Sequence, residues 1–427
     1  MTSLTSRVSD ATAGRDRVLD AVKAFALVVV VIGHSLAWHI TPEGTAVNVL
    51  ELARGLIVLT WVFQVLPLFF AAGAVSNAAS LGRSSSGAYL RHRSRRLLTP
   101  VVVYCVVWTV VLLPLTLASE QARPAGRFLS QLLWFAGVYL LVVAAAPVTT
   151  RWRSRPRLTL GVWLGVILAV DVARGQGAPA AIGWLNLLLV WGWLHQLGYE
   201  LPRLRTYQSR ATALVAAALL ALTVLVAVLG PYSSSLITIS GDAELSNLSP
   251  PSIVLALYGA AQILALAALW PVLSRLLANV RIWTVVAVVG VRGMGMYLWH
   301  IPLVGIAAAI ALATSWSVPP LSLAWWAVHL AVVALVLPLA WLIAGVADHA
   351  QRRLERLPRL FGLPAWLIAV AGGALVLNIS VTGFATWLGD GMLGIPSMAM
   401  VNLLLLAALW QAAASPRTTR GPERAVS

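Results

Sequence analysis

Long apolar segments recur along almost the whole chain, and they constrain its fold more than any other feature of the sequence. A transmembrane helix needs about 20 mainly apolar residues. Twelve segments approach this length, at roughly 21–40, 55–79, 97–118, 129–148, 158–173, 180–199, 211–230, 253–273, 285–312, 321–347, 364–385 and 397–414. None alternates polar and apolar residues as a membrane-barrel strand does. The sequence therefore predicts an all-α, polytopic integral membrane protein with about 10–12 transmembrane helices.

The basic residues indicate how these helices are oriented. The 427 residues include 30 basic and 14 acidic ones, for a formal net charge of +16. If the N-terminus is cytoplasmic, 24 of the basic residues fall in cytoplasmic segments and 3 in outer loops. Because Lys and Arg concentrate in cytoplasmic loops, both termini are predicted to be cytoplasmic. The charges are spread over seven short segments, so we expect them to meet anionic lipid of the bilayer and expect no nucleic-acid partner.

The first predicted helix holds ionisable residues, which are costly at membrane depth and often functional. Lys23 and His34 are eleven residues apart. This spacing places them on one helix face, about 16 Å apart along the axis. Asp20 can pair with Lys23 three residues later. The set suits a pathway that ends in a reaction at His34; the plainer alternatives are a snorkelling Lys23 and a His34 that only joins two helices.

A second basic group lies in the predicted cytoplasmic loop RHRSRRLLTP at 91–100. Arg93 and Arg96 are three apart at the start of the third predicted helix and share a face. Two guanidinium groups bind phosphate well, and a helix N-terminus adds its dipole. The alternative is that these residues only hold the orientation of the chain.

The remaining membrane residues give weaker signals. His195 and His329 are predicted to be structural and His39 to be interfacial. Arg292, in the Gly-rich segment that breaks the ninth predicted span, needs an anionic partner. No zinc-ligand spacing or catalytic carboxylate pair is visible, so we expect no metal and no bound cofactor. The single cysteine, Cys105, excludes an intrachain disulfide.

Five landmarks, in order, resemble those of the membrane acyltransferase family 3. The first helix carries Arg17, Leu19-Asp20, Lys23 and Gly33-His34-Ser35. The later landmarks are LPLFFAAGA at 66–74, Arg93-x-x-Arg96 with Pro100, QLLWFAGVYL at 131–140 and MYLWHIPL at 296–303. Lys23 stands where many relatives have Arg.

The resemblance implies an O-acyltransferase that moves an acyl group, most commonly acetyl, from cytoplasmic acyl-CoA to a hydroxyl of a glycan, lipid-linked sugar or small metabolite. It implies that His34 is the general base, that Lys23, Arg93 and Arg96 bind acyl-CoA, and that the supporting residues are Arg17, Asp20, Ser35 and His300. Acyl-CoA would be a co-substrate, and the protein would lie in the cytoplasmic membrane. The sequence names neither the acceptor nor an oligomeric state.

The resemblance also divides the chain. It implies a cytoplasmic segment at 1–20, an acyltransferase domain at 21–347, a basic loop at 348–363, two additional helices at 364–414 and a cytoplasmic tail at 415–427. From another functional class, a transporter or flippase for a lipid or glycan is the alternative. The scarcity of acidic residues at membrane depth and the lack of a visible inverted repeat speak against it.

Overall fold

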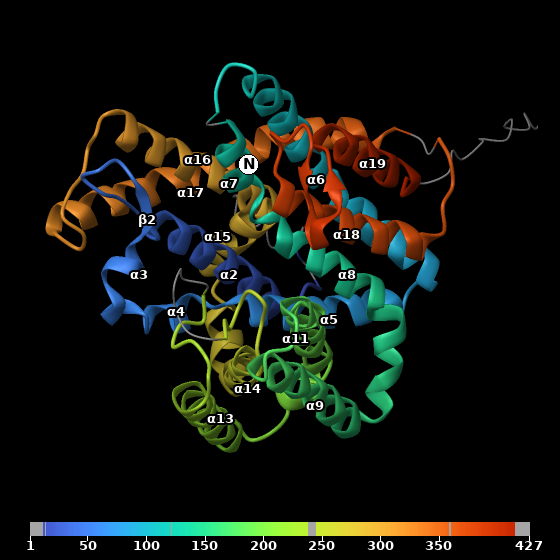
Figure 1. Cartoon of the computed structure of the whole chain (residues 1–427). Coiled ribbons are helices and arrows are strands. Elements are labelled where there is room, and N and C mark those ends of the chain that lie inside the picture. The colour runs from blue at the N-terminus through green and yellow to red at the C-terminus, as the bar shows by residue number, and fades with distance from the viewer. Residues whose placement is uncertain (1–11, 13, 121, 238–244, 358–359, 415–427) are drawn as a thin grey trace, which may run out of the picture. The chain divides into compact units, whose positions relative to one another are not determined.

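The computed structural model describes residues 12, 14–120, 122–237, 245–357 and 360–414 (Figure 1). Most of the predicted N-terminal segment and the whole predicted tail lie outside the described residues. The described chain is helical, as predicted, with strands only in two short hairpins: β1 (Trp38–Ile40) with β2 (Ala46–Asn48), and β3 (Gly389–Asp390) with β4 (Pro396–Ser397).

The helices follow one another along the chain with short connections. They are α2 (Arg17–Leu36), α3 (Val49–Leu52), α4 (Leu59–Phe63), α5 (Leu66–Leu81), α6 (Ser86–Leu115), α7 (Ala122–Ser130), α8 (Leu133–Thr149), α9 (Pro156–Gly175), α10 (Ala180–Gly183), α11 (Leu185–Gly198), α12 (Leu201–Leu204), α13 (Ser209–Leu229), α14 (Ile253–Leu276), α15 (Val280–Val291), α16 (Gly293–Ala313), α17 (Leu323–Glu355), α18 (Ala365–Thr382) and α19 (Ala399–Ala412), with 3-10 turns η1 (Arg54–Leu56), η2 (Thr150–Ser154) and η3 (Met392–Gly394).

Ten helical segments of the described chain are long and apolar enough to cross a membrane. The predicted span at 285–312 is divided at Arg292 into α15 and α16, because the helix breaks in the Gly-rich segment; Pro302 lies inside α16 without ending it. The predicted span at 180–199 is divided into α10 and α11. The helix count is therefore confirmed at the lower end of the predicted range.

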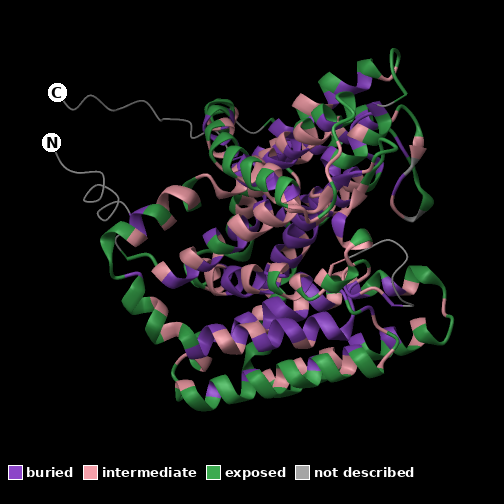
Figure 2. Ribbon diagram, turned by 90° about the vertical axis from the view of Figure 1, so that its left-hand side faces the viewer, coloured by how far each residue is buried: buried purple, intermediate pink, exposed green. Residues whose placement is uncertain are grey.

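Several helices carry exposed residues along most of their length (Figure 2), and many of these residues are large and apolar. On α13, Leu214, Val228 and Leu229 are each more than 70% exposed. In water such a surface would drive association, whereas lipid tails solvate it. The exposed apolar surface therefore agrees with a multi-pass membrane protein.

The chain divides into two compact units, and α8 and α17 each run from one unit into the other. Unit 1 comprises residues 1–83 and 145–345, and unit 2 comprises residues 84–144 and 346–427. In unit 1, α2 packs against α5, α15 and α16, and α13 lies along α14. Close packing of α11 on α5 depends on Gly198, because a Cβ there would lie 2.6 Å from Ala71 Cα.

Unit 2 is built around α6, which packs against α18 and α19. The two helices beyond the predicted acyltransferase domain therefore belong to the same unit as α6. Gly137, within the QLLWFAGVYL landmark, allows α8 to approach α18 closely, since a Cβ at this position would lie 2.7 Å from Leu377 Cγ. A landmark that reads as functional in the sequence thus has a packing role here.

Candidate functional site

His34 lies near the C-terminal end of α2, in unit 1. The helix begins at Arg17 because the Asp16 carboxylate accepts hydrogen bonds from the backbone N–H groups of Val18 and Leu19, at 3.2 Å each. It then runs unbroken to Leu36. Lys23 and His34 are therefore on one helix face, as their spacing predicts.

His34 meets a second histidine, 266 residues further along the chain. Its Nδ1 lies 3.0 Å from Nε2 of His300 on α16, and the two rings stack with centroids 5.2 Å apart. His300 is fully buried, and its own Nδ1 lies 3.2 Å from the Met296 carbonyl oxygen one turn earlier. Two of the sequence-predicted residues are thus brought together.

The chain of contacts fixes where the protons of a neutral pair must be. A carbonyl oxygen only accepts, so His300 Nδ1 carries a hydrogen and donates it to Met296. His300 Nε2 then holds a lone pair and accepts from His34 Nδ1. His34 consequently carries its hydrogen on Nδ1 and keeps the lone pair of Nε2, which is the arrangement that a general base needs.

Lys23 and Asp20 have other partners than the sequence suggests. Lys23 Nζ donates to Ser76 Oγ on α5 at 2.8 Å. Asp20 forms an ion pair with Arg15, with Arg15 Nε 2.7 Å from Asp20 Oδ2. Ser76 carried no signal in the sequence, because a serine in an apolar helix is common.

Arg17 and Ser35 hold α2 in place. Arg17 donates to the Leu277 carbonyl at 2.9 Å and stacks over the Trp283 ring at 5.1 Å, which ties the start of α2 to the end of α14 and to α15. Ser35 is fully buried and its hydroxyl donates to the Val31 carbonyl at 2.8 Å. These contacts make the two residues supports of the helix that carries His34.

Arg93 and Arg96 lie on α6, in unit 2. The prediction that they sit at a helix N-terminus is wrong, because α6 begins at Ser86 with Ser85 as its cap. The helix dipole acts within the first turn, so it does not reach these residues. Arg96 is exposed and Arg93 is half-buried with its guanidinium 5.8 Å from the Tyr89 ring.

Two other residues that the sequence singled out, Arg292 and His195, contact protein groups that give them a structural role. Arg292 stacks over the Trp341 ring at 3.6 Å and donates to the Trp341 carbonyl at 3.1 Å, so an aromatic face and a carbonyl contact it where an anion was expected. His195 is buried with Nε2 3.0 Å from Asn77 Nδ2.

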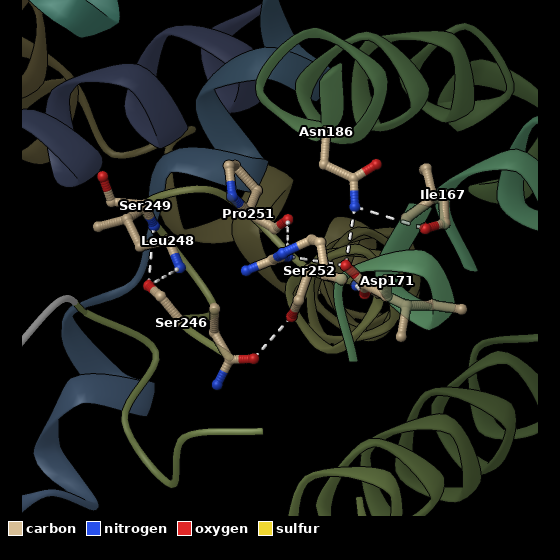
Figure 3. A network of polar contacts seen from close by, with 11 residues as sticks. Ile167, Asp171, Asn186, Ser246, Leu248, Ser249, Pro251 and Ser252 are labelled. Carbon is tan, nitrogen blue, oxygen red and sulfur yellow. Dashed lines mark hydrogen bonds and ion pairs between the residues drawn. The ribbon is translucent and has the colours of Figure 1, made fainter. Parts of the chain in front are cut away.

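Asp171, on α9, is the centre of a polar network at the loop before α14 (Figure 3). Its carboxylate accepts from Arg174 at 2.8 Å, from Asn186 at 2.9 Å and from the backbone N–H of Ile253 at 2.7 Å. Burial and the negative charge of Asp171 raise the pKa of Tyr232 to about 12. The carboxylate thus caps α14 and clamps the loop, which is a structural role.

A cavity of about 200 Å³ lies where β1, α16 and α17 meet, all in unit 1. His39 and His329 line it together with three tryptophans. Burial lowers the pKa of His39, and repulsion from His329 lowers it further. Sequence reasoning missed this pocket because its residues come from three elements that are apolar all round and show no motif.

No group of three or more His, Cys, Asp or Glu side chains among the described residues is arranged to hold a metal ion.

Comparison with known proteins gives one match. Residues 16–345 match the family model described as an acyltransferase domain. No curated protein and no solved structure matches the chain significantly. The matched residues include His34, His300 and their neighbours as well as Arg93 and Arg96, and they form most of the chain. The protein therefore belongs to membrane acyltransferase family 3, and it is a multi-pass membrane acyltransferase.

Proposed function

We propose that this protein transfers an acyl group, acetyl in the simplest case, from acyl-CoA to a hydroxyl, with His34 as the general base. The observation that carries the proposal is the chain from His34 through His300 to the Met296 carbonyl, with contacts of 3.0 Å and 3.2 Å. It supports a base whose tautomer and orientation are set before the substrate arrives.

In the proposed reaction, the acceptor oxygen attacks the thioester carbon while His34 Nε2 takes the hydroxyl proton. The new C–O bond forms and the C–S bond breaks, and the proton passes from His34 to the departing thiolate of CoA. His300 accepts the Nδ1–H bond throughout, so it stabilises the imidazolium that forms on His34. This is the part that a carboxylate takes in serine hydrolases.

For the donor, we propose that Arg93 and Arg96 bind phosphate groups of acyl-CoA, because guanidinium pairs match phosphate geometry. We assign Lys23 to the donor as well, on the same face of α2 as His34 and about 16 Å away along the axis. The donor is made in the cytoplasm, so we place the protein in the cytoplasmic membrane with the donor groups on the cytoplasmic side.

The test uses the purified full chain in lipid nanodiscs with radiolabelled acetyl-CoA and extracted membrane acceptors. His34→Ala is expected to abolish transfer. His300→Ala is expected to lower the rate by about 10²–10³-fold, because His34 loses the partner that fixes its tautomer. His195→Gln is the matched control, since it changes another buried membrane histidine and is expected to keep transfer.

Transfer by folded His34→Ala at the wild-type rate would refute the assignment of the base. Equal losses in His195→Gln and His300→Ala would show that the His300 effect is one of folding and remove its positioning role.

A further inference from the structure

The cavity of about 200 Å³ in unit 1 is lined by residues that follow each histidine of the pair along the chain. β1, which contributes Trp38, His39 and Ile40, follows α2 four residues after His34. On α16, Ala307 and Ala311 line the cavity, seven and eleven residues after His300. These spacings return to the His300 face of the helix. The cavity thus continues outward from the proposed base, toward the predicted extracytoplasmic side.

Most of the lining is apolar, and one of its two histidines, His329, is already used by the protein. His329 places Nδ1 2.9 Å from the Trp325 carbonyl and Nε2 3.0 Å from the Trp38 carbonyl. Its ring stacks on Trp325 with centroids 3.9 Å apart. Both ring nitrogens lie against backbone carbonyls, to which the neutral ring donates one hydrogen bond and the protonated ring two. His329 therefore shapes the wall of the cavity and leaves ligand recognition to other groups.

Two donors in the lining are not used. Among the residues that the structure describes, the indole Nε1 atoms of Trp38 and Trp325 are buried without a hydrogen-bond partner. Trp325 is 1% exposed, so water does not reach it from outside. Leaving such a donor unpaired is unfavourable, and a ligand oxygen would supply the missing hydrogen bond once the indole turns its N–H toward the cavity. The cavity therefore presents aromatic faces and at most a few hydrogen-bonding groups.

We infer that this cavity is the acceptor subsite, and that it holds a single aromatic or aliphatic ring of a hydrophobic alcohol, with an oxygen of that molecule accepting from Trp38 or Trp325. The inference rests on the proposed acyl transfer. A cavity of about 150 Å³ admits a benzene ring, so this one suits one substituted ring. A polyhydroxylated sugar would bury several hydroxyl groups against Ile, Val and Ala side chains, and each hydroxyl left without a hydrogen bond would weaken binding.

The experiment measures binding without any acyl donor, so that it does not depend on the reaction. The probe is 2-(4-fluorophenyl)ethanol, followed by fluorine NMR with the full chain in lipid nanodiscs. Wild type is expected to bind the probe saturably above its partition into empty nanodiscs. Ala307→Leu fills the cavity and is expected to weaken binding at least tenfold. Ala309→Leu is the matched control, because it adds the same atoms on the exposed face of α16 and is expected to leave binding unchanged.

Trp325→Phe tests whether the indole N–H contributes to binding. The smaller ring leaves the cavity open to the probe. It keeps an aromatic ring and removes the N–H donor, and it is expected to weaken binding of the probe about three- to tenfold. Equal binding in wild type, Ala307→Leu and Trp325→Phe would overturn the inference, as would a probe that only partitions into lipid. Displacement of the probe by methyl glucoside at comparable concentration would overturn the preference for a hydrophobic alcohol.

Addition of acetyl-CoA separates this inference from the proposed function. Acetylation of the probe by wild type and not by Ala307→Leu supports both. Saturable binding that Ala307→Leu loses, with no transfer to any acceptor, refutes the transferase proposal and leaves the cavity as a binding site. Transfer to the probe at equal rates in wild type and Ala307→Leu refutes the assignment of the cavity as the acceptor subsite and supports the acyltransferase function.

Discussion

At the scale of single residues, buried polar groups in this membrane protein fall into two kinds. Asp171 has both carboxylate oxygens occupied, by Arg174 and Asn186 on one and the N–H of Ile253 on the other. His34 uses one ring nitrogen for His300 and retains a lone pair on the second. A group with all its bonds made stabilises a structure, whereas a group with a lone pair in reserve can take a proton.

Asp171→Asn should therefore lower stability. The amide nitrogen cannot accept a hydrogen bond, and Arg174, whose side chain is 8% exposed, would lose its counter-charge. Removing one partner of a buried ion pair costs about 3–5 kcal/mol, so we expect a clear fall in the thermal unfolding temperature in detergent. Glu43→Gln removes the same charge from an exposed loop position and should change stability by less than about 0.5 kcal/mol. Equal unfolding temperatures for the two variants would contradict the stabilising role of Asp171.

At the scale of elements, α6 carries arginines with different tasks. Arg95 donates to the Trp410 carbonyl at 2.8 Å and to the Leu354 carbonyl at 3.0 Å, and it stacks over the Trp410 ring at 3.8 Å. It thereby fastens α19 and the end of α17 to α6. Arg96, one residue later, is exposed. An arginine-rich stretch of α6 thus contains both a structural residue and the proposed donor residues, which sequence alone does not separate.

Substitutions of these α6 arginines are therefore expected to differ in effect, one lowering stability and the other lowering acetyl-CoA binding. Arg95→Ala should destabilise the protein by about 2 kcal/mol, because charged hydrogen bonds to carbonyls and a cation–π contact are lost. The double variant Arg93→Ala with Arg96→Ala should unfold near the wild-type temperature but bind acetyl-CoA at least tenfold more weakly by calorimetry. Arg151→Ala with Arg155→Ala removes the same charge from exposed positions and should bind normally. Unchanged binding in the Arg93/Arg96 variant would leave those arginines with an orienting role only.

The same helices show what the sequence can predict. Hydropathy located the spans because a membrane helix must be apolar over its length, and the Gly-rich segment marked the break at Arg292. His34 and His300 were each recognisable by resemblance. Their 3.0 Å contact was not predictable, because no local sequence pattern encodes a pairing over 266 residues. The Met296 carbonyl carries no signal at all, since every residue has one. The contact between Lys23 and Ser76 could not be predicted either, because the two residues come from different helices.

At the scale of the whole molecule, the basic residues of the loops predict how the helices are oriented in the membrane. The basic loops alternate between the two sides when α11 and α19 are counted as crossings beside the ten helical segments of membrane length in the described chain, and on that count both ends are predicted to share one side of the membrane. In that arrangement the β1–β2 hairpin is extracytoplasmic and the η2 turn is cytoplasmic. On this topology, the histidine pair is expected to lie between Lys23, proposed to bind the acyl donor, and the cavity proposed for the acceptor.

Cysteine labelling checks this orientation. The chain has a single cysteine, Cys105, which is buried in α6 and should give no background with a membrane-impermeant maleimide. Glu43→Cys, in the β1–β2 hairpin, should be labelled in intact cells. Arg155→Cys, beside η2, should be labelled only after the membrane is permeabilised. The reverse pattern would invert the predicted topology.

The absence of a carboxylate from the path that runs from His34 through His300 to the Met296 carbonyl has an electrical consequence. A fixed charge in a bilayer experiences part of the transmembrane voltage, up to about 2.3 kcal/mol per 100 mV. Neutral imidazoles and a peptide carbonyl carry no such charge. The neutral resting pair is therefore expected to have the same energy in an energised membrane as in a discharged one, so that the membrane voltage can act on the proposed reaction only once His34 takes up a proton.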